Sequence, residues 1–343
     1  MDYRLIQEAA LDRNSILDEE TRALYCCTPK KGRKSKMAVS SSGNFCVAFP
    51  MKSYKNDSKL CYRIWYTEEF KEKKFDKIAE HVSKDLKLLD LPYFIDYKFL
   101  NDAINVGGRH LPGVKMEWID GERLDNYLKN HRSKDAVLQL AKEFMQMCVA
   151  FKKNGISHGD LSNSNILILS NGEIRLVDYD SVYVPSMSDR FYQTTTGQAA
   201  FQHPQRLNQR LKITCSDDNF SQQVIYVSLL AIAQNLDLIN EISETELLFT
   251  STDIENVYNF KKKKNELLEK IGKSNNSELL ARLEELERAV SGSLSEVRSI
   301  VDFKMQESTQ ILMANYCGTC GHHFNNQADN FCPICGTQRL ILK

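Results

Sequence analysis

The sequence predicts an α+β protein that ends in a small metal-binding module. Apolar residues recur at helical spacing across 135–154 and across 279–297, as they do on the buried face of an amphipathic helix. Two short apolar runs, 166–169 and 174–177, flank the turn residues Ser-Asn-Gly and therefore predict a β-hairpin. Two cysteine pairs near the C-terminus have the spacing of a zinc site.

The bulk composition is that of an ordinary globular chain. Of the 343 residues, 42% are hydrophobic and 26% are charged, and the length suffices for a two-lobed domain and a small module. The net charge is zero, which argues against a nucleic-acid partner. Because the chain starts without an apolar signal and has no run of 18 apolar residues, we expect a cytoplasmic protein that does not enter a membrane.

Residues 158–180 carry the strongest functional signal. Asp160 is followed five residues later by Asn165 and thirteen residues further on by Asp178. The predicted hairpin would bring Asn165 near Asp178. Phosphoryl transfer needs such a set, because one carboxylate orients the acceptor hydroxyl while an amide and a second carboxylate hold Mg²⁺ against the phosphates. A polar hairpin in an unrelated fold is the alternative, and the matched spacing of two motifs argues against it.

The two motifs, His-Gly-Asp-Leu-Ser-Asn-Ser-Asn and Asp-Tyr-Asp, resemble the catalytic loop and the magnesium-binding D-F-G of protein kinases. Gln-His-Pro at 202–204 stands near the place of the A-P-E segment, and Asp218 begins a D-x-W-S-like segment. In that family, the aspartate corresponding to Asp218 braces the catalytic loop. The combination is similar to bacterial eukaryotic-type Ser/Thr kinases. The resemblance implies a bilobal protein-kinase-like fold, with a small β-rich lobe and a large helical lobe, that uses ATP and Mg²⁺ and acts on a protein substrate.

The resemblance is weaker in the small lobe. Residues 40–49 align with the glycine-rich loop over the phosphates but keep only Gly43. Glycine lets backbone amides approach a phosphate closely, so serines in its place predict a looser cover. Arg63 replaces the lysine that pairs with the phosphates, and it keeps the charge in a longer, forked side chain.

Further nucleotide-binding residues follow from the same resemblance. Glu80, in the helical stretch 67–89, is the expected salt-bridge partner of Arg63. Glu72 is a rival, and an exposed helix carboxylate is the alternative. Glu117 and Trp118 lie in a segment that resembles the hinge, where backbone groups would receive adenine.

The C-terminal cysteines predict a zinc ribbon. Two C-x2-C pairs, separated by eleven residues, are formed by Cys317, Cys320, Cys332 and Cys335. Four thiolates at this spacing suit tetrahedral Zn²⁺, which would supply the folding energy that so short a segment lacks. Disulfides are the alternative, and the absence of a secretion signal disfavours them. We expect the ribbon to bind a partner protein or to stabilise the chain.

The expected organisation has five parts. They are an N-terminal flank (1–37), a small lobe (38–116), a large lobe (117–303), a linker (304–315) and the zinc ribbon (316–343).

Three functions fit these features. The first is an ATP- and magnesium-dependent protein Ser/Thr kinase. The glycine-poor loop and Arg63 leave open a second, a catalytically weak nucleotide-binding scaffold, or pseudokinase. His-Gly-Asp followed by asparagine also resembles aminoglycoside and choline phosphotransferases, so the third is a small-molecule phosphotransferase.

Overall fold

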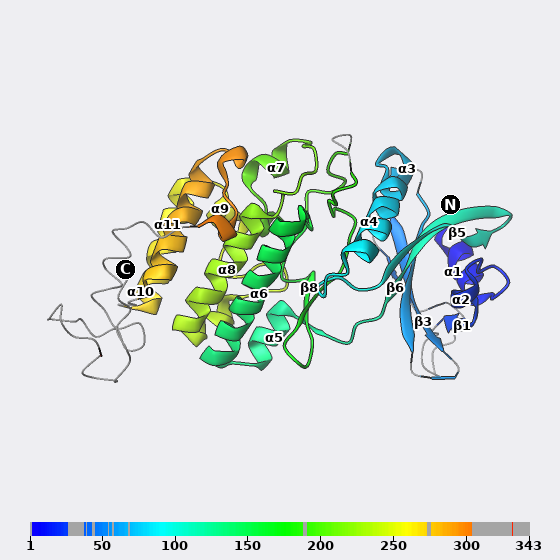
Figure 1. Ribbon diagram of the computed structural model, residues 1–343, viewed down its shortest axis with the longest axis horizontal. Coiled ribbons are helices and arrows are strands. Elements are labelled where there is room, and N and C mark those ends of the chain that lie inside the picture. Colours follow the sequence, from blue (N-terminus) through cyan, green and yellow to red (C-terminus); the bar gives the residue numbers. More distant parts are fainter. Residues whose placement is uncertain are drawn as a thin grey trace.

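The computed structural model describes residues 2–26, 38, 40–42, 45–53, 55–56, 58–67, 69–187, 191–272, 276–303 and 331. They form a small lobe built around a β-sheet and a large helical lobe, joined end to end (Figure 1). This is the two-lobed α+β arrangement that the sequence resemblance implied. No helix in the described residues is long and apolar enough to span a membrane.

In the described part of the chain, the small lobe forms a six-stranded antiparallel sheet. Its strands are β1 (Leu24–Cys26), β2 (Ser41–Ser42), β3 (Cys46–Ser53), β4 (Lys59–Trp65), β5 (Tyr97–Val106) and β6 (Arg109–Glu117). The order is β1-β3-β4-β6-β5, and β2 pairs with β3. Two helices cover the two faces, α1 (Tyr3–Leu11) on one and α4 (Phe75–Leu89) on the other (Figure 1). The short helices α2 (Glu19–Arg22) and α3 (Glu69–Glu72) precede β1 and α4.

Alternation along the central strands decides which side chains face the large lobe. Val47, Tyr62 and Ile64 are fully buried in the core beneath α1. Successive side chains of a strand point to opposite faces of the sheet. Arg63, between two of these residues, therefore points to the other face, where it contacts Cys46 and the large lobe.

The N-terminal flank is part of the small lobe rather than a segment before it. Ile6 and Ile16 are buried in the same core as the sheet, and β1 pairs with β3. Lys115 of β6 donates to Asp18, with a distance of 3.2 Å. The expected boundary at residue 37 missed this because the pairing partner lies about 25 residues further along the chain, where local sequence patterns do not reach.

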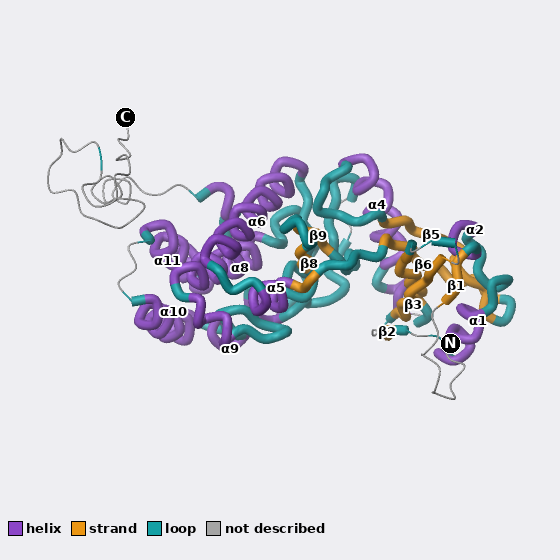
Figure 2. Tube along the Cα trace, turned by 90° about the horizontal axis from the view of Figure 1, so that it is seen from below, coloured by secondary structure: helices purple, strands orange, loops and turns teal. Residues whose placement is uncertain are grey.

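The large lobe is helical. Its long helices α6 (Lys134–Asn154) and α8 (Asn219–Gln234) pack side by side (Figures 1 and 2). Around them lie α5 (Leu124–Asn130), α7 (Pro204–Asn208), α9 (Ser251–Ile254), α10 (Val257–Ile271) and α11 (Ser277–Ser291), with the 3₁₀ turns η1 (Ala199–Phe201), η2 (Leu236–Glu241), η3 (Leu294–Glu296) and η4 (Ile300–Asp302). Helix α8 is buried along nearly its whole length, so it forms the centre of this lobe.

A small antiparallel sheet between the lobes positions the residues of the predicted site. Its strands are β7 (Glu122–Arg123), β8 (Ile166–Ile168) and β9 (Ile174–Leu176). Strands β8 and β9 are the predicted hairpin, which is confirmed. Beyond the paired strands, the Val177 N–H donates to the Asn165 carbonyl oxygen at 3.1 Å. The segments that carry Asn165 and Asp178 are thereby held side by side.

Candidate active site

Asp218 fixes the backbone of the catalytic loop. Its carboxylate accepts hydrogen bonds from the backbone N–H of His158 and, at 2.8 Å, of Gly159. Burial raises the pKa of Asp218 to about 6, although the two N–H groups act in the opposite direction. The bracing contact that the resemblance implied for Asp218 is therefore present.

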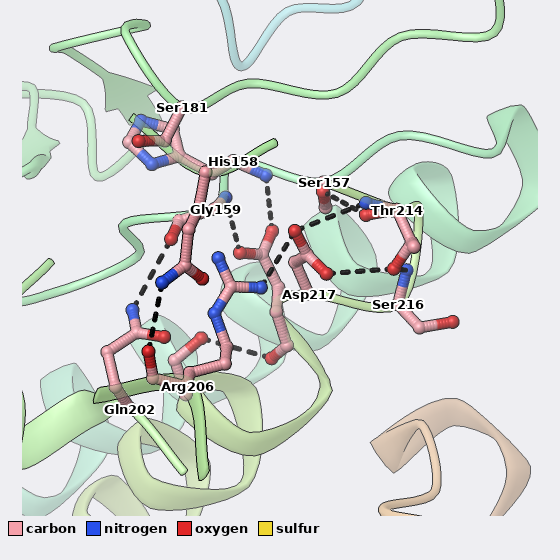
Figure 3. A network of polar contacts seen from close by, with 12 residues as sticks. Ser157, His158, Gly159, Ser181, Gln202, Arg206, Thr214, Ser216 and Asp217 are labelled. Atoms are coloured by element: carbon pink, nitrogen blue, oxygen red, sulfur yellow. Dashed lines mark hydrogen bonds and ion pairs between the residues drawn. The ribbon is translucent and has the colours of Figure 1, made fainter. Parts of the chain in front are cut away.

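A buried polar network extends this brace (Figure 3). Arg206 and Asp217 form a buried ion pair with a nitrogen–oxygen distance of 2.7 Å. Asp217 also accepts hydrogen bonds from the backbone N–H and the hydroxyl of Thr214. The Ser157 hydroxyl in turn donates to the Thr214 carbonyl oxygen at 2.7 Å. Ser157, which precedes the catalytic loop, is thus connected through Thr214 and Asp217 to the segment that leads into α8.

Position 159 requires glycine, both for its left-handed backbone conformation and for the close approach of Ser181. Its φ is +77°, and a Cβ at this position would lie 2.3 Å from the Ser181 carbonyl oxygen. Gln202 donates to the Gly159 carbonyl oxygen at 3.3 Å. The arginine that H-R-D kinases carry here cannot fit, because the chain after the Asp-Tyr-Asp motif passes too close to Gly159.

Asp160 is held at the centre of the loop by backbone groups. Its Oδ1 accepts a hydrogen bond from the Gln198 N–H at 3.1 Å. Gly197, with a φ of +71°, leaves room for that oxygen, since a Cβ there would lie 2.5 Å from it. Asn165 donates from Nδ2 to the Asp160 carbonyl oxygen at 2.8 Å. Burial raises the pKa of the Asp160 carboxyl, against the influence of nearby His158, which makes the carboxylate a better proton acceptor.

The guanidinium of Arg63 lies between the two carboxylates of the Asp-Tyr-Asp motif. Its Nη1 is 3.0 Å from Asp178 Oδ1, and its Nη2 pairs with Asp180 Oδ2. Burial alone would lower the pKa of Arg63, but Asp180 and Asp178 raise it well above its ordinary value. The side chain of Asp178 is 48% exposed, whereas those of Arg63 and Asp180 are each 14% exposed. Asp178 is therefore the carboxylate that an incoming metal ion can reach.

The expected ion pair between Arg63 and Glu80 is not formed in the structure, so that pairing needs correction. Glu80 instead binds Lys77 and Lys84 of its own helix, at 3.3 and 2.9 Å. The buried face of α4 is apolar and consists of Phe75, Ile78, Ala79, Val82 and Leu86. Glu80 lies on the exposed side because it follows Ala79 by one residue, about 100° around the helix. The rival, Glu72, ends α3 and lines a cavity with Lys73.

Tyr179 fastens the Asp-Tyr-Asp motif to both lobes. Its hydroxyl donates to the Leu176 carbonyl oxygen and accepts from the Ile95 N–H, both at 2.8 Å. Its buried ring meets the edge of His158, with centroids 6.2 Å apart. Sequence reasoning gave this hydroxyl no role. The available signal was the tyrosine itself, since a buried phenol needs a hydrogen-bond partner.

Glu117 and Trp118 lie at the junction expected for the hinge. Glu117 ends β6, and its N–H donates to the Asp96 carbonyl oxygen at 3.0 Å. Trp118 is 40% exposed, and its indole N–H donates to Asp120. Their contact with adenine stays a prediction. Gly43 and the four cysteines of the predicted zinc ribbon lie outside the described residues, so their assignments also stay predictions.

The oxygen donors of the site fit Mg²⁺ carried by a nucleotide. Within the described residues, no group of three or more His, Cys, Asp or Glu side chains is placed to hold a metal ion. Mg²⁺ rarely needs such a cage, because it usually binds one or two protein carboxylates together with substrate phosphates and water. The half-exposed carboxylate of Asp178 and the amide oxygen of Asn165 are donors of this kind.

In this two-lobed fold, Asp218 holds the backbone of the His-Gly-Asp loop, and Arg63 of β4 faces the Asp-Tyr-Asp motif. This arrangement defines the class of nucleotide-dependent phosphotransferases. The chain matches the family model of the protein kinase domain over residues 42–288, and it belongs to the protein kinase family. The match spans both lobes and both motifs, and it ends before the cysteine-rich segment. No curated protein matches the chain.

Proposed function

We propose that this chain is a catalytically active protein Ser/Thr kinase that transfers the γ-phosphoryl group of ATP to hydroxyl acceptors. One observation carries the proposal: the catalytic loop is present and rigidly held. Asp160 is fixed by the Gln198 N–H, while Asp218 binds the two preceding backbone amides. Catalysis of phosphoryl transfer consists mainly of positioning and charge neutralisation. A chain that only bound nucleotide would not need its catalytic carboxylate fixed in this way.

Each residue has a separate role in this mechanism. Asp160 orients the acceptor hydroxyl and takes up its proton as the new oxygen–phosphorus bond forms, while the bond from the γ-phosphorus to the bridging oxygen breaks and ADP leaves. Asn165 and Asp178 hold Mg²⁺, which neutralises phosphate charge when it is bound. Arg63 presents a fixed positive charge to the phosphates from the small lobe.

The match to the protein kinase domain favours a protein acceptor over a small molecule. A cavity of about 700 Å³ lies beside the segment that follows the Asp-Tyr-Asp motif. Phe45 and Lys73 line it from the small lobe, and Thr194–Thr196 and Leu207–Arg210 line it from the large lobe. This space, which both lobes line, can hold side chains of an extended peptide.

Transfer of radiolabel from the γ-position of ATP tests the acceptor class. Wild-type protein should label itself or added protein with Mg²⁺ present, and hydrolysis of the product should release phosphoserine or phosphothreonine. Labelling confined to aminoglycosides, choline or other small hydroxyl compounds would instead favour the small-molecule phosphotransferase. No labelling of any acceptor would favour the nucleotide-binding scaffold.

We further propose that residues 316–343 form a zinc ribbon that binds a partner protein or stabilises the chain. The proposal is supported by the spacing of its four cysteines. From the sequence features given above, we also propose a cytoplasmic location, a bacterial origin and no nucleic-acid partner.

A further inference from the structure

We propose that Asp180 is the positioning residue for Arg63, in place of the helix glutamate that protein kinases use to orient their phosphate-binding lysine. The inference rests on the proposed nucleotide binding, but it does not depend on the chain being catalytically active. It concerns the third position of the Asp-Tyr-Asp motif, where the D-F-G pattern has glycine.

The contacts of Arg63 define the plane of its guanidinium. Nη1 contacts Asp178, Nη2 contacts Asp180, and Nε donates to the sulfur of Cys46. Partners on all three nitrogens leave the fork little freedom to rotate. Charge-assisted hydrogen bonds of this kind are stronger and more directional than neutral ones.

Burial separates the roles of the two carboxylates. The Asp180 side chain is 14% exposed, as is Arg63, whereas Asp178 is 48% exposed. A carboxylate that must also bind Mg²⁺ is a poor permanent anchor for the arginine. Asp180 is sheltered from solvent and has no metal-binding role in the proposed mechanism, so it can hold Arg63 whether or not Asp178 is engaged elsewhere.

The backbone directs Asp180 towards Arg63. Tyr179, the residue before it, is fixed by hydrogen bonds to Ile95 and Leu176. The Asp180 carbonyl oxygen accepts a hydrogen bond from the Thr194 hydroxyl at 3.2 Å. Asp178 has a positive φ of 68°, and its carboxylate and that of Asp180 both contact Arg63.

Helix α4 offers no such carboxylate. Glu80 is on its exposed side and binds two lysines of the same helix, and the face towards the sheet is apolar. The two departures from the kinase pattern, Arg63 for lysine and Asp180 for glycine, are therefore related. Arginine replaces lysine because a longer, forked side chain reaches the motif, and aspartate replaces glycine because it supplies the carboxylate that the helix lacks.

Nucleotide affinity tests this assignment without relying on turnover. We would measure binding of a non-hydrolysable ATP analogue with Mg²⁺ by calorimetry for Asp180→Asn, Arg63→Gln, Glu80→Gln and the double variants. Asp180→Asn should weaken binding on the order of tenfold, as expected for a lost charge-assisted contact. The double variant with Arg63→Gln should bind no more weakly than Arg63→Gln alone, because coupled residues are non-additive. Asp180→Glu should retain more affinity than Asp180→Asn.

Controls separate positioning from loss of structure. Asp102→Asn on β5, where Asp102 forms an exposed pair with His110 of β6, should leave affinity unchanged. Thermal unfolding should verify that all variants fold. Unchanged affinity in Asp180→Asn, or a larger loss in Glu80→Gln, would overturn the assignment. Tighter binding in Asp180→Asn would also overturn it, since Asp180 would then restrain Arg63 instead of presenting it. If wild-type protein bound no nucleotide, the proposed function would fail together with this inference.

Discussion

Two glycines with left-handed backbones show how a single residue is constrained in this protein. Gly159 has a φ of +77° and Gly172 a φ of +86°. A Cβ on Gly159 would lie 2.3 Å from the Ser181 carbonyl oxygen, whereas a Cβ on Gly172 would meet nothing within 4 Å. The pair therefore separates the cost of backbone strain from the cost of a steric clash.

Replacing each glycine by alanine should give unequal losses of stability. Gly172→Ala should lower the free energy of unfolding by about 1–2 kcal/mol, the cost of a left-handed backbone for an L-residue. Gly159→Ala should add the cost of overpacking, about 1–3 kcal/mol more. Urea unfolding of the two variants and the wild type measures both. Equal losses would show that the catalytic loop can move away from Ser181 without cost.

At this scale, the sequence predicts what local motifs encode. The grouping of Asp160, Asn165 and Asp178 could be predicted, because one loop and one hairpin fix their spacing. The partner of Arg63 was not found, because Asp180 lies 117 residues further along the chain and only the tertiary fold brings it to Arg63. The hydroxyl of Tyr179 was also missed, since its acceptor and donor lie on different segments.

At the scale of elements, the pairing of strands that are adjacent in sequence could be predicted. The pairing of strands that are far apart in sequence could not. The hairpin of β8 and β9 follows from two apolar runs and a short turn. The packing of α1 and β1 on the small-lobe sheet joins segments that are far apart in sequence. Residues 202–217 likewise reach the catalytic loop only through the buried contacts of the tertiary fold (Figure 3).

The buried pair of Arg206 and Asp217 should therefore be a main support of the catalytic loop. Arg206→Met leaves Asp217 buried without its cation and should lower the free energy of unfolding by about 3–5 kcal/mol. The double variant Arg206→Met, Asp217→Asn should recover part of this loss because no uncompensated charge remains.

An exposed ion pair supplies the matched control for that comparison. Lys84→Met breaks the contact with Glu80 on the surface of α4 and should change stability by less than about 1 kcal/mol. Calorimetric unfolding compares the variants. A change of similar size for Arg206→Met and Lys84→Met would contradict the supporting role given to the network.

At the scale of the whole molecule, the described core closes before the cysteine-rich segment begins. Ile300 is the last residue of the large core cluster, and the ring of Phe303 covers Arg282 at 4.1 Å. Among the described residues, the buried surface of the two-lobed domain comes from those that precede the predicted linker. Motif order predicts that this domain is separate from the cysteine-rich segment, and that separation stays a prediction.

Removal of residues 313–343 should leave the kinase domain folded, and the full chain should carry one Zn²⁺ bound by Cys317, Cys320, Cys332 and Cys335. Elemental analysis of protein purified without chelator measures the metal, and thermal unfolding of the truncated chain measures the domain. Substoichiometric zinc in the full chain would contradict the ribbon. Complete unfolding of the truncated chain would contradict its independence.

The central claim is that this member of the protein kinase family is catalytically active, and comparison of wild type with Asp160→Asn tests it most directly. Both proteins should bind a magnesium–ATP analogue with similar affinity, because Asp160 acts on the acceptor. Transfer of the γ-phosphoryl group to protein should fall by on the order of 10²-fold or more in the variant, the scale of a lost acid–base group. Equal background transfer by the two proteins, with binding intact in both, would contradict the claim and leave a nucleotide-binding scaffold.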